Sequence, residues 1–248
     1  MKRLLLVLIG ALVLAPSPLT PAASANSAIS QVKIVEENLG AIELELEKLG
    51  VDVISVLDEM QAEYEQLAQG GVTRSQSEAI AEIVSTLEQL KADYSAFKAG
   101  ESGYATRGVA HPVYSPAVAA VIAWFVTAKY TLAAELLTHA VSNNSPGSNY
   151  KPYNGSRVAS SPVWGKIRAG SATSGSSTFT LTGSVVQKDL HYAINKFKWT
   201  KSGSKISLRD LYDFAPGDYN GIAGIAVNTM YLAQQAGVIV PFYTRITA

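Results

Sequence analysis

One stripe of apolar residues constrains the fold of this chain more than any other feature. Between residues 32 and 60, apolar side chains recur at alternating steps of three and four positions, a spacing that keeps one narrow face of a long helix apolar. The intervening positions are largely acidic, as expected for a helix face in water. The stripe consists of Val32, Val35, Leu39, Ile42, Leu46, Leu49, Val53, Val56 and Met60.

A second stripe predicts the partner of this helix. Gly70-Gly71 ends the first helix, and a second helix is expected from residues 75–77, with the same apolar spacing over residues 80–97. Residues 26–100 are therefore predicted to form an antiparallel helical hairpin or coiled coil. The first helix spans roughly 60 Å and the second about 35 Å at about 1.5 Å per residue. We expect the first helix to break near Gly50, or a third element to cover its free end.

Residues 101–145 are predicted to form a linker and a third, apolar helix. Ser115-Pro116 provides an N-cap followed by proline, and the helical pattern continues to about Ser142. Residues 117–128 are apolar all round but too few to span a bilayer, which favours a buried core helix over a transmembrane one. Glu135 and His139 lie one turn apart, and such a pair is at most half of a metal site.

Residues 146–248 are predicted to form an antiparallel β-rich domain. Four short runs with period-two alternation suggest strands at 163–167, 179–185, 190–194 and 197–199. A turn at residues 201–204 joins the last of these to a strand over 206–214. A helix over residues 222–233, capped by Asp218 or Asn220 and ended by Gly237, precedes a last strand at 238–246, where Pro241 suggests a sheet edge or bulge. The expected fold class is α+β.

The N-terminus has the features of a secretory signal peptide. Lys2 and Arg3 precede an apolar run from Leu4 to Leu14, and Ala23-Ser24-Ala25 matches the small residues that signal peptidase recognises. Cleavage is expected after Ala25, which makes residues 1–25 a signal peptide and the product secreted or periplasmic. The chain has no cysteine, which excludes a disulfide scaffold, thiol catalysis and zinc sites built from thiolates.

The formal net charge of zero is the sum of two unlike regions. Residues 26–100 hold 14 acidic and 5 basic residues, whereas residues 101–248 hold 6 acidic and 13 basic residues. Charge asymmetry of this kind concerns association rather than fold. It suggests separate modules with different partners, and the alternative is two ordinary solvated faces. The lysines of the basic region could meet an anionic surface such as the bacterial cell envelope, whereas an exported protein is not expected to bind nucleic acid.

A dense group of polar residues at 209–220 is the candidate site. Asp210, Asp213 and Asp218 are candidate oxygen ligands for a divalent cation, and Asp210, Tyr212 and Asp213 are candidate catalytic residues. On a strand, Asp210 and Tyr212 share one face and Asp213 the other, so they converge only if the backbone turns. The alternative is a polar connection in which Asp213 and Asp218 bond backbone amides and Tyr212 packs.

Asp210-Leu211-Tyr212-Asp213, followed by Phe214, resembles the Asp-x-Tyr-Asp motif of the colicin M family. These secreted bacterial toxins have a β-rich catalytic domain and cleave a lipid-linked peptidoglycan precursor between lipid and pyrophosphate, with a divalent cation. The resemblance covers 40 to 60 C-terminal residues and implies catalytic or metal-binding roles for Asp210, Tyr212 and Asp213, with Mg²⁺ as the cofactor. The family motif continues with His-Arg where this chain has Tyr219-Asn220. Arg209 or Arg245 is then the candidate for the missing positive charge.

Two functional hypotheses follow. The first is a secreted, bacteriocin-like toxin or effector that acts on a lipid-linked pyrophosphate of the cell envelope. The second is a non-catalytic envelope or extracellular binding protein whose helical hairpin mediates assembly, for example as a homo-oligomer. For the hairpin itself, a helical subdomain packed against the rest of the chain is favoured over a stalk or an oligomerisation seam.

Overall fold

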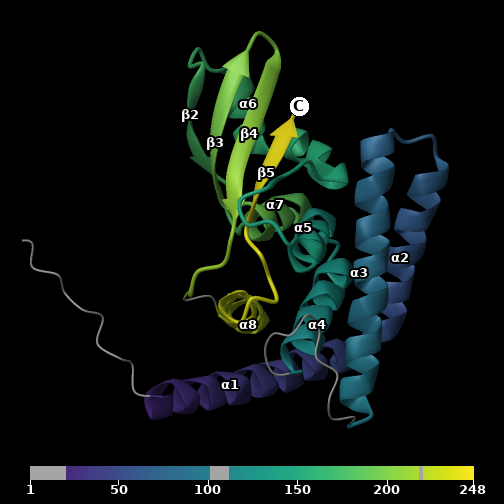
Figure 1. Ribbon diagram of the computed structural model, residues 1–248. Coiled ribbons are helices and arrows are strands. Elements are labelled where there is room, and N and C mark those ends of the chain that lie inside the picture. Colours follow the sequence, from purple (N-terminus) through teal and green to yellow (C-terminus); the bar gives the residue numbers. More distant parts are fainter. Residues whose placement is uncertain (1–20, 101–111, 218–219) are drawn as a thin grey trace, which may run out of the picture.

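A computed structural model describes residues 21–100, 112–217 and 220–248, with side chains from residue 29 onward. Residues 1–20 of the predicted signal peptide and residues 101–111 of the predicted linker lie outside the described residues. The fold is α+β, with N-terminal helices followed by a region that contains a five-stranded sheet (Figure 1). The helices are α1 (Pro21–Lys48), α2 (Val53–Gln69), α3 (Arg74–Lys98), α4 (Tyr114–Thr127), α5 (Thr131–Ser142), η2 (Tyr153–Ser160), α6 (Pro162–Ala169), α7 (Val185–Ala193) and α8 (Ile222–Gln235). The strands are β1 (Asn149–Tyr150), β2 (Ser174–Thr178), β3 (Lys196–Ser202), β4 (Lys205–Tyr212) and β5 (Phe242–Thr247).

The predicted break in the first helix is confirmed. Gly50 has a φ of 68°, and the carboxylate of Asp52 accepts a hydrogen bond from Ser55 N at 2.8 Å, which starts α2 as a new helix. The break also changes which residues of the apolar stripe face the core. Leu57 is buried in place of the expected Val56, and Leu49 is exposed. Helices α2 and α3 form the antiparallel hairpin, while α1 turns away to pack against α4 and α8 (Figure 1).

The prediction of one third helix is wrong, since the segment forms two. Lys129 adopts a φ of 63°, which ends α4 and allows α5 to start in a new direction. Helix α4 also begins two residues earlier than expected, with Val113 in place of Ser115 at the N-cap position, so that Ser115 and Pro116 lie in its first turn. The residues of α4 from Tyr114 to Phe125 are all buried, which confirms the core interpretation. In the described part of the chain, no helix is long and apolar enough to cross a membrane.

The sheet has the strand order β1-β5-β4-β3-β2 and is mixed, because β1 pairs with β5 in parallel while the other pairings are antiparallel. The predicted β3–β4 hairpin is present. Three of the other assignments are corrected by the structure: residues 163–167 lie in α6, residues 190–194 lie at the end of α7, and β2 ends before residue 179. Serine N-caps explain why α6 and α7 form helices. The hydroxyl of Ser161 accepts a hydrogen bond from Trp164 N at the start of α6, and Ser184 forms a capping box with Gln187 at the start of α7.

The last helix and strand occur in the predicted order, with altered ends. Helix α8 follows Gly221 and has no side-chain cap among the described residues, so the cap predicted at Asn220 is wrong. Strand β5 begins after Pro241 and lies between β1 and β4, so it is not an edge strand. One face of the sheet is buried against the helices, and the opposite face, where Lys198 and Arg209 alternate with those buried positions, is exposed.

Candidate functional site

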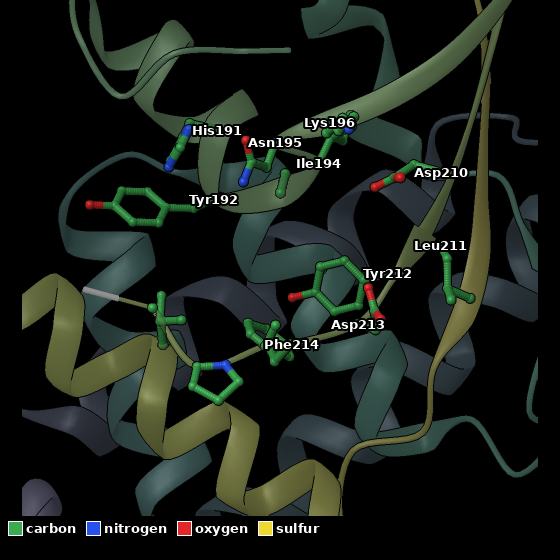
Figure 2. Close-up of a pocket in the computed structure, with 15 residues that line it drawn as sticks. His191, Tyr192, Ile194, Asn195, Lys196, Asp210, Leu211, Tyr212, Asp213 and Phe214 are labelled. Carbon is green, nitrogen blue, oxygen red and sulfur yellow. The ribbon is translucent and has the colours of Figure 1, made fainter. Parts of the chain in front are cut away.

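A cavity of about 370 Å³ lies at the end of β4. Its walls come from β4 and the segment that follows it, from the last turn of α7, and from one residue of α8. Asp210, Tyr212 and Asp213 all line it, so the structure brings these three predicted residues together. Figure 2 shows the Asp210, Tyr212 and Asp213 side chains close to one another at the end of β4.

The segment after β4 is held in place by α8. The backbone N–H of Phe214 donates to Gln234 Oε1 at 2.9 Å, and Gln234 Nε2 donates to the Phe214 carbonyl at 3.2 Å. Further along, Gly217 N donates to Asn228 Oδ1 at 3.4 Å. These bonds bend the chain away from the sheet directly after Asp213. This is the turn that the sequence required for the carboxylates to converge.

The pKa values of both carboxyl groups are raised. Burial raises the pKa of Asp210 to about 8, with the negative charge of Asp213 adding to this and the backbone hydrogen bond from Leu211 opposing it. Burial also raises the pKa of Asp213 above its ordinary value. A pKa of about 8 lets Asp210 keep its proton at neutral pH, as a general acid requires.

Tyr212 adds a buried hydroxyl group to this site. Its side chain is buried on the inner face of β4, and burial raises the pKa of the phenol well above its ordinary value. The hydroxyl finds no hydrogen-bond partner among the described residues. A buried phenol without a partner is costly, which suggests that it is kept to bond a ligand.

The donor set for a divalent cation is incomplete in the described part of the chain. Asp218 lies outside the described residues, and no group of three or more His, Cys, Asp or Glu residues that could hold a metal is found within them. Asp210 and Asp213 alone supply fewer oxygen ligands than Mg²⁺ or Ca²⁺ sites usually have, and Asp210 holds a proton at neutral pH.

The structure also places basic residues that the sequence could not locate relative to one another. Arg245 lies directly opposite Arg209 in the β4–β5 pairing, and Lys198 lies opposite Arg209 in the β3–β4 pairing. A hollow of about 350 Å³ on this face shares Lys196, Asp210 and Leu211 with the cavity. The predicted turn at residues 201–204 would place Lys198 opposite Ser207, whereas the turn lies one residue later and places it opposite Arg209. The sequence therefore predicted the hairpin but not this pairing, and no sequence signal indicated the position of Arg245.

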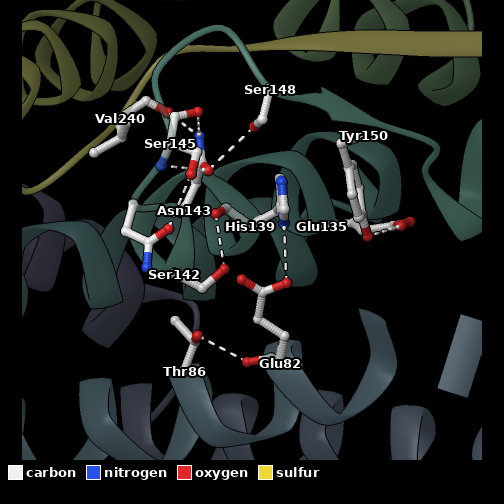
Figure 3. A network of polar contacts seen from close by, with 11 residues as sticks. Glu82, Thr86, Glu135, His139, Ser142, Asn143, Ser145, Ser148, Tyr150 and Val240 are labelled. Carbon is white, nitrogen blue, oxygen red and sulfur yellow. Dashed lines mark hydrogen bonds and ion pairs between the residues drawn. The ribbon is translucent and has the colours of Figure 1, made fainter. Parts of the chain in front are cut away.

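Glu135 and His139, the predicted half of a metal site, make contacts that hold the fold together (Figure 3). The buried carboxylate of Glu135 accepts hydrogen bonds from Tyr150 Oη at 2.8 Å, Tyr153 N at 2.5 Å, and the backbone and side-chain nitrogens of Asn154, both at 2.9 Å. His139 stacks on Tyr150 with 3.7 Å between ring centroids, and burial lowers its pKa to about 4. Glu135 therefore anchors the segment after β1 to α5.

Comparisons with protein-family models, with curated proteins and with solved structures gave no match.

Proposed function

We propose that this protein is an exported bacterial toxin or effector that hydrolyses a lipid-linked pyrophosphate of the cell envelope. The observation that carries the proposal is that Asp210, Tyr212 and Asp213 line one cavity that adjoins a row of basic residues, and that burial raises the pKa of Asp210 to about 8. The motif shared with the colicin M family and the predicted signal peptide support the same function. The proposal assigns the phosphate groups of the substrate to the basic side of the site.

Each residue has a defined role in the proposed hydrolysis. Asp213 accepts a proton from a water molecule as its oxygen attacks the phosphorus atom next to the lipid. The bond between that phosphorus and the lipid oxygen breaks, and Asp210 donates its proton to the departing oxygen. The products are a lipid alcohol and the pyrophosphate-bearing remainder. The Tyr212 hydroxyl donates a hydrogen bond to a phosphate oxygen, and Lys196 offsets its negative charge.

The test is release of lipid alcohol from the purified peptidoglycan precursor in detergent. Asp213→Asn and Asp210→Asn should each lower the rate by at least about a hundredfold, the usual contribution of an acid or base. The exposed Glu59 on α2 provides the control Glu59→Gln. Assays with Mg²⁺ and with a chelator establish whether the predicted cofactor is needed. Undiminished release by both aspartate variants, with circular dichroism unchanged, would sink the assignment.

The second candidate is a non-catalytic envelope-binding protein, which the exposed basic sheet face favours. In that case Asp213→Asn leaves binding unchanged. Assembly through the hairpin is the other part of this hypothesis, and Leu46→Glu tests it. Because Leu39, Ile42 and Leu46 are buried within the chain itself, the variant should lose stability as well as any assembly. Sedimentation velocity at several protein concentrations separates these two effects.

A further inference from the structure

Three cations lie in one row across the exposed face of the sheet. Lys198, Arg209 and Arg245 occupy directly paired positions on β3, β4 and β5. Neighbouring strands are about 4.8 Å apart, so the row is about 10 Å long. Like charges directly opposite each other destabilise a sheet. No ion pair relieves this repulsion in the described part of the chain, where the partners of Arg209 and Arg245 are the ring of Tyr243 and Asn149 Oδ1.

The rest of this face strengthens its positive charge. Lys196 and Lys205 also alternate with the buried positions of their strands and are exposed. Among the described residues, the outward positions of β2, β3, β4 and β5 carry no aspartate or glutamate. Leu211, which is 38% exposed, pairs with Tyr243 next to the row and adds apolar surface. The face is therefore broad, basic and partly apolar.

We propose that this outer sheet face docks the protein on the surface of an anionic phospholipid bilayer. Basic side chains near such a surface each strengthen binding by roughly fivefold, and apolar side chains beside them enter the interface. A nucleic acid fits this face less well, because single strands bind through exposed aromatic rings and the Tyr243 ring is covered by Arg209 at 3.7 Å. Docking of this kind follows from the charge pattern of the sheet face and does not depend on the proposed hydrolysis.

Docking in this way places the Asp210 cavity at the membrane. The hollow on the basic face and the cavity share Lys196, Asp210 and Leu211, so the two lie next to each other at the end of β4. A lipid-linked substrate is then presented with its charged part at the site while its lipid stays in the bilayer. The face supplies affinity for the membrane surface, and the cavity supplies the chemistry.

The test is partition of the full chain onto vesicles that contain no substrate. One variant combines Lys198→Gln, Arg209→Gln and Arg245→Gln, and it is compared on vesicles of phosphatidylglycerol mixed with phosphatidylcholine and on phosphatidylcholine alone. The matched control removes three exposed cations from the helices, by Lys33→Gln, Lys48→Gln and Arg74→Gln. Both variants keep the same N-terminal segment, so the ratio of their partition coefficients reports the sheet face.

The sheet variant should partition roughly a hundredfold more weakly onto the anionic vesicles, whereas the control changes about equally on both vesicle types and far less. The melting temperature of the sheet variant should stay the same or rise, because the repulsion among the three cations of the row is relieved. Equal partition of the two triple variants would overturn the proposal. Tighter binding to a short oligonucleotide, with displacement of the vesicles, would overturn it in favour of nucleic acid.

Discussion

Replacing Asp210 with asparagine is expected to stabilise the protein at pH 8 and to leave it almost unchanged at pH 4. Burial and the charge of Asp213 raise the pKa of the Asp210 carboxyl group from 3.8 to about 8. In the unfolded chain the same group ionises near 3.8. Between these two values the folded protein holds a proton that the unfolded chain has released, so the free energy of unfolding falls as the pH rises.

The size of the effect follows from this difference of about 4 in pKa. At about 1.4 kcal/mol per pH unit it corresponds to roughly 6 kcal/mol. The side chain is only partly buried, and screening by water reduces the figure by about half, to about 3 kcal/mol. Asparagine has nearly the same shape and does not ionise. At pH 8 the variant should therefore unfold at a temperature roughly 10 °C higher than the wild type.

Urea denaturation followed by tryptophan fluorescence at pH 4, 6 and 8 measures this difference. Other buried acids, such as Asp189, contribute alike to both proteins and cancel. Glu59→Gln, on the exposed side of α2, is the control and should show no pH-dependent difference. Parallel pH curves for wild type and Asp210→Asn, or a less stable variant at pH 8, would refute the reasoning that a buried carboxyl group is retained here at a cost in stability.

Three further predictions concern the rest of the fold. Arg157→Ala removes the ion pair, 2.7 Å long, to the buried Asp189 and should lower the free energy of unfolding by about 3 kcal/mol at pH 8, measured by urea denaturation. The loss should be smaller at pH 5, because the pKa of Asp189 is raised to about 6. An equal loss at both pH values contradicts this. His139→Phe should unfold with a free energy up to about 3 kcal/mol higher than wild type at pH 4, and with little difference at pH 7. The reason is that, as the pH falls, the unfolded wild-type chain takes up the histidine proton before the folded protein does. Thermal melts at pH 4 that show no such gain count against it. Leu57→Ala should cost about 3 kcal/mol and Val56→Ala under about 1 kcal/mol, and the reverse order would place the helix break elsewhere.

The long helices were predictable because their pattern repeats over many turns. Val35, Leu39, Ile42 and Leu46 are buried as their spacing indicated, and Gly50 marked the break. The short elements were not predictable. Trp164 and Leu190 lie in helices of eight and nine residues, and two or three apolar residues at alternate positions fit such a helix as well as a strand.

The same contrast applies to the candidate site. The motif at residues 210–213 named three side chains that do line one cavity, because a strand and the turn after it are local structures. The elevated pKa of Asp210 was not predictable, since it depends on burial by α7 and on the turn held by Gln234. The row of basic residues on the outer face of the sheet was likewise not predictable from the sequence.

The sequence by itself determined the α+β class, the paired helices α2 and α3, and the β3–β4 hairpin, because each follows from periodicity and turn chemistry within a short stretch of chain. Only the tertiary structure decided that α1 leaves the hairpin and that Arg245 joins Lys198 and Arg209 in one row. The physical reason is that strand register and helix packing are set by burial between segments distant in sequence, and local spacing carries no information about which distant segment supplies the partner.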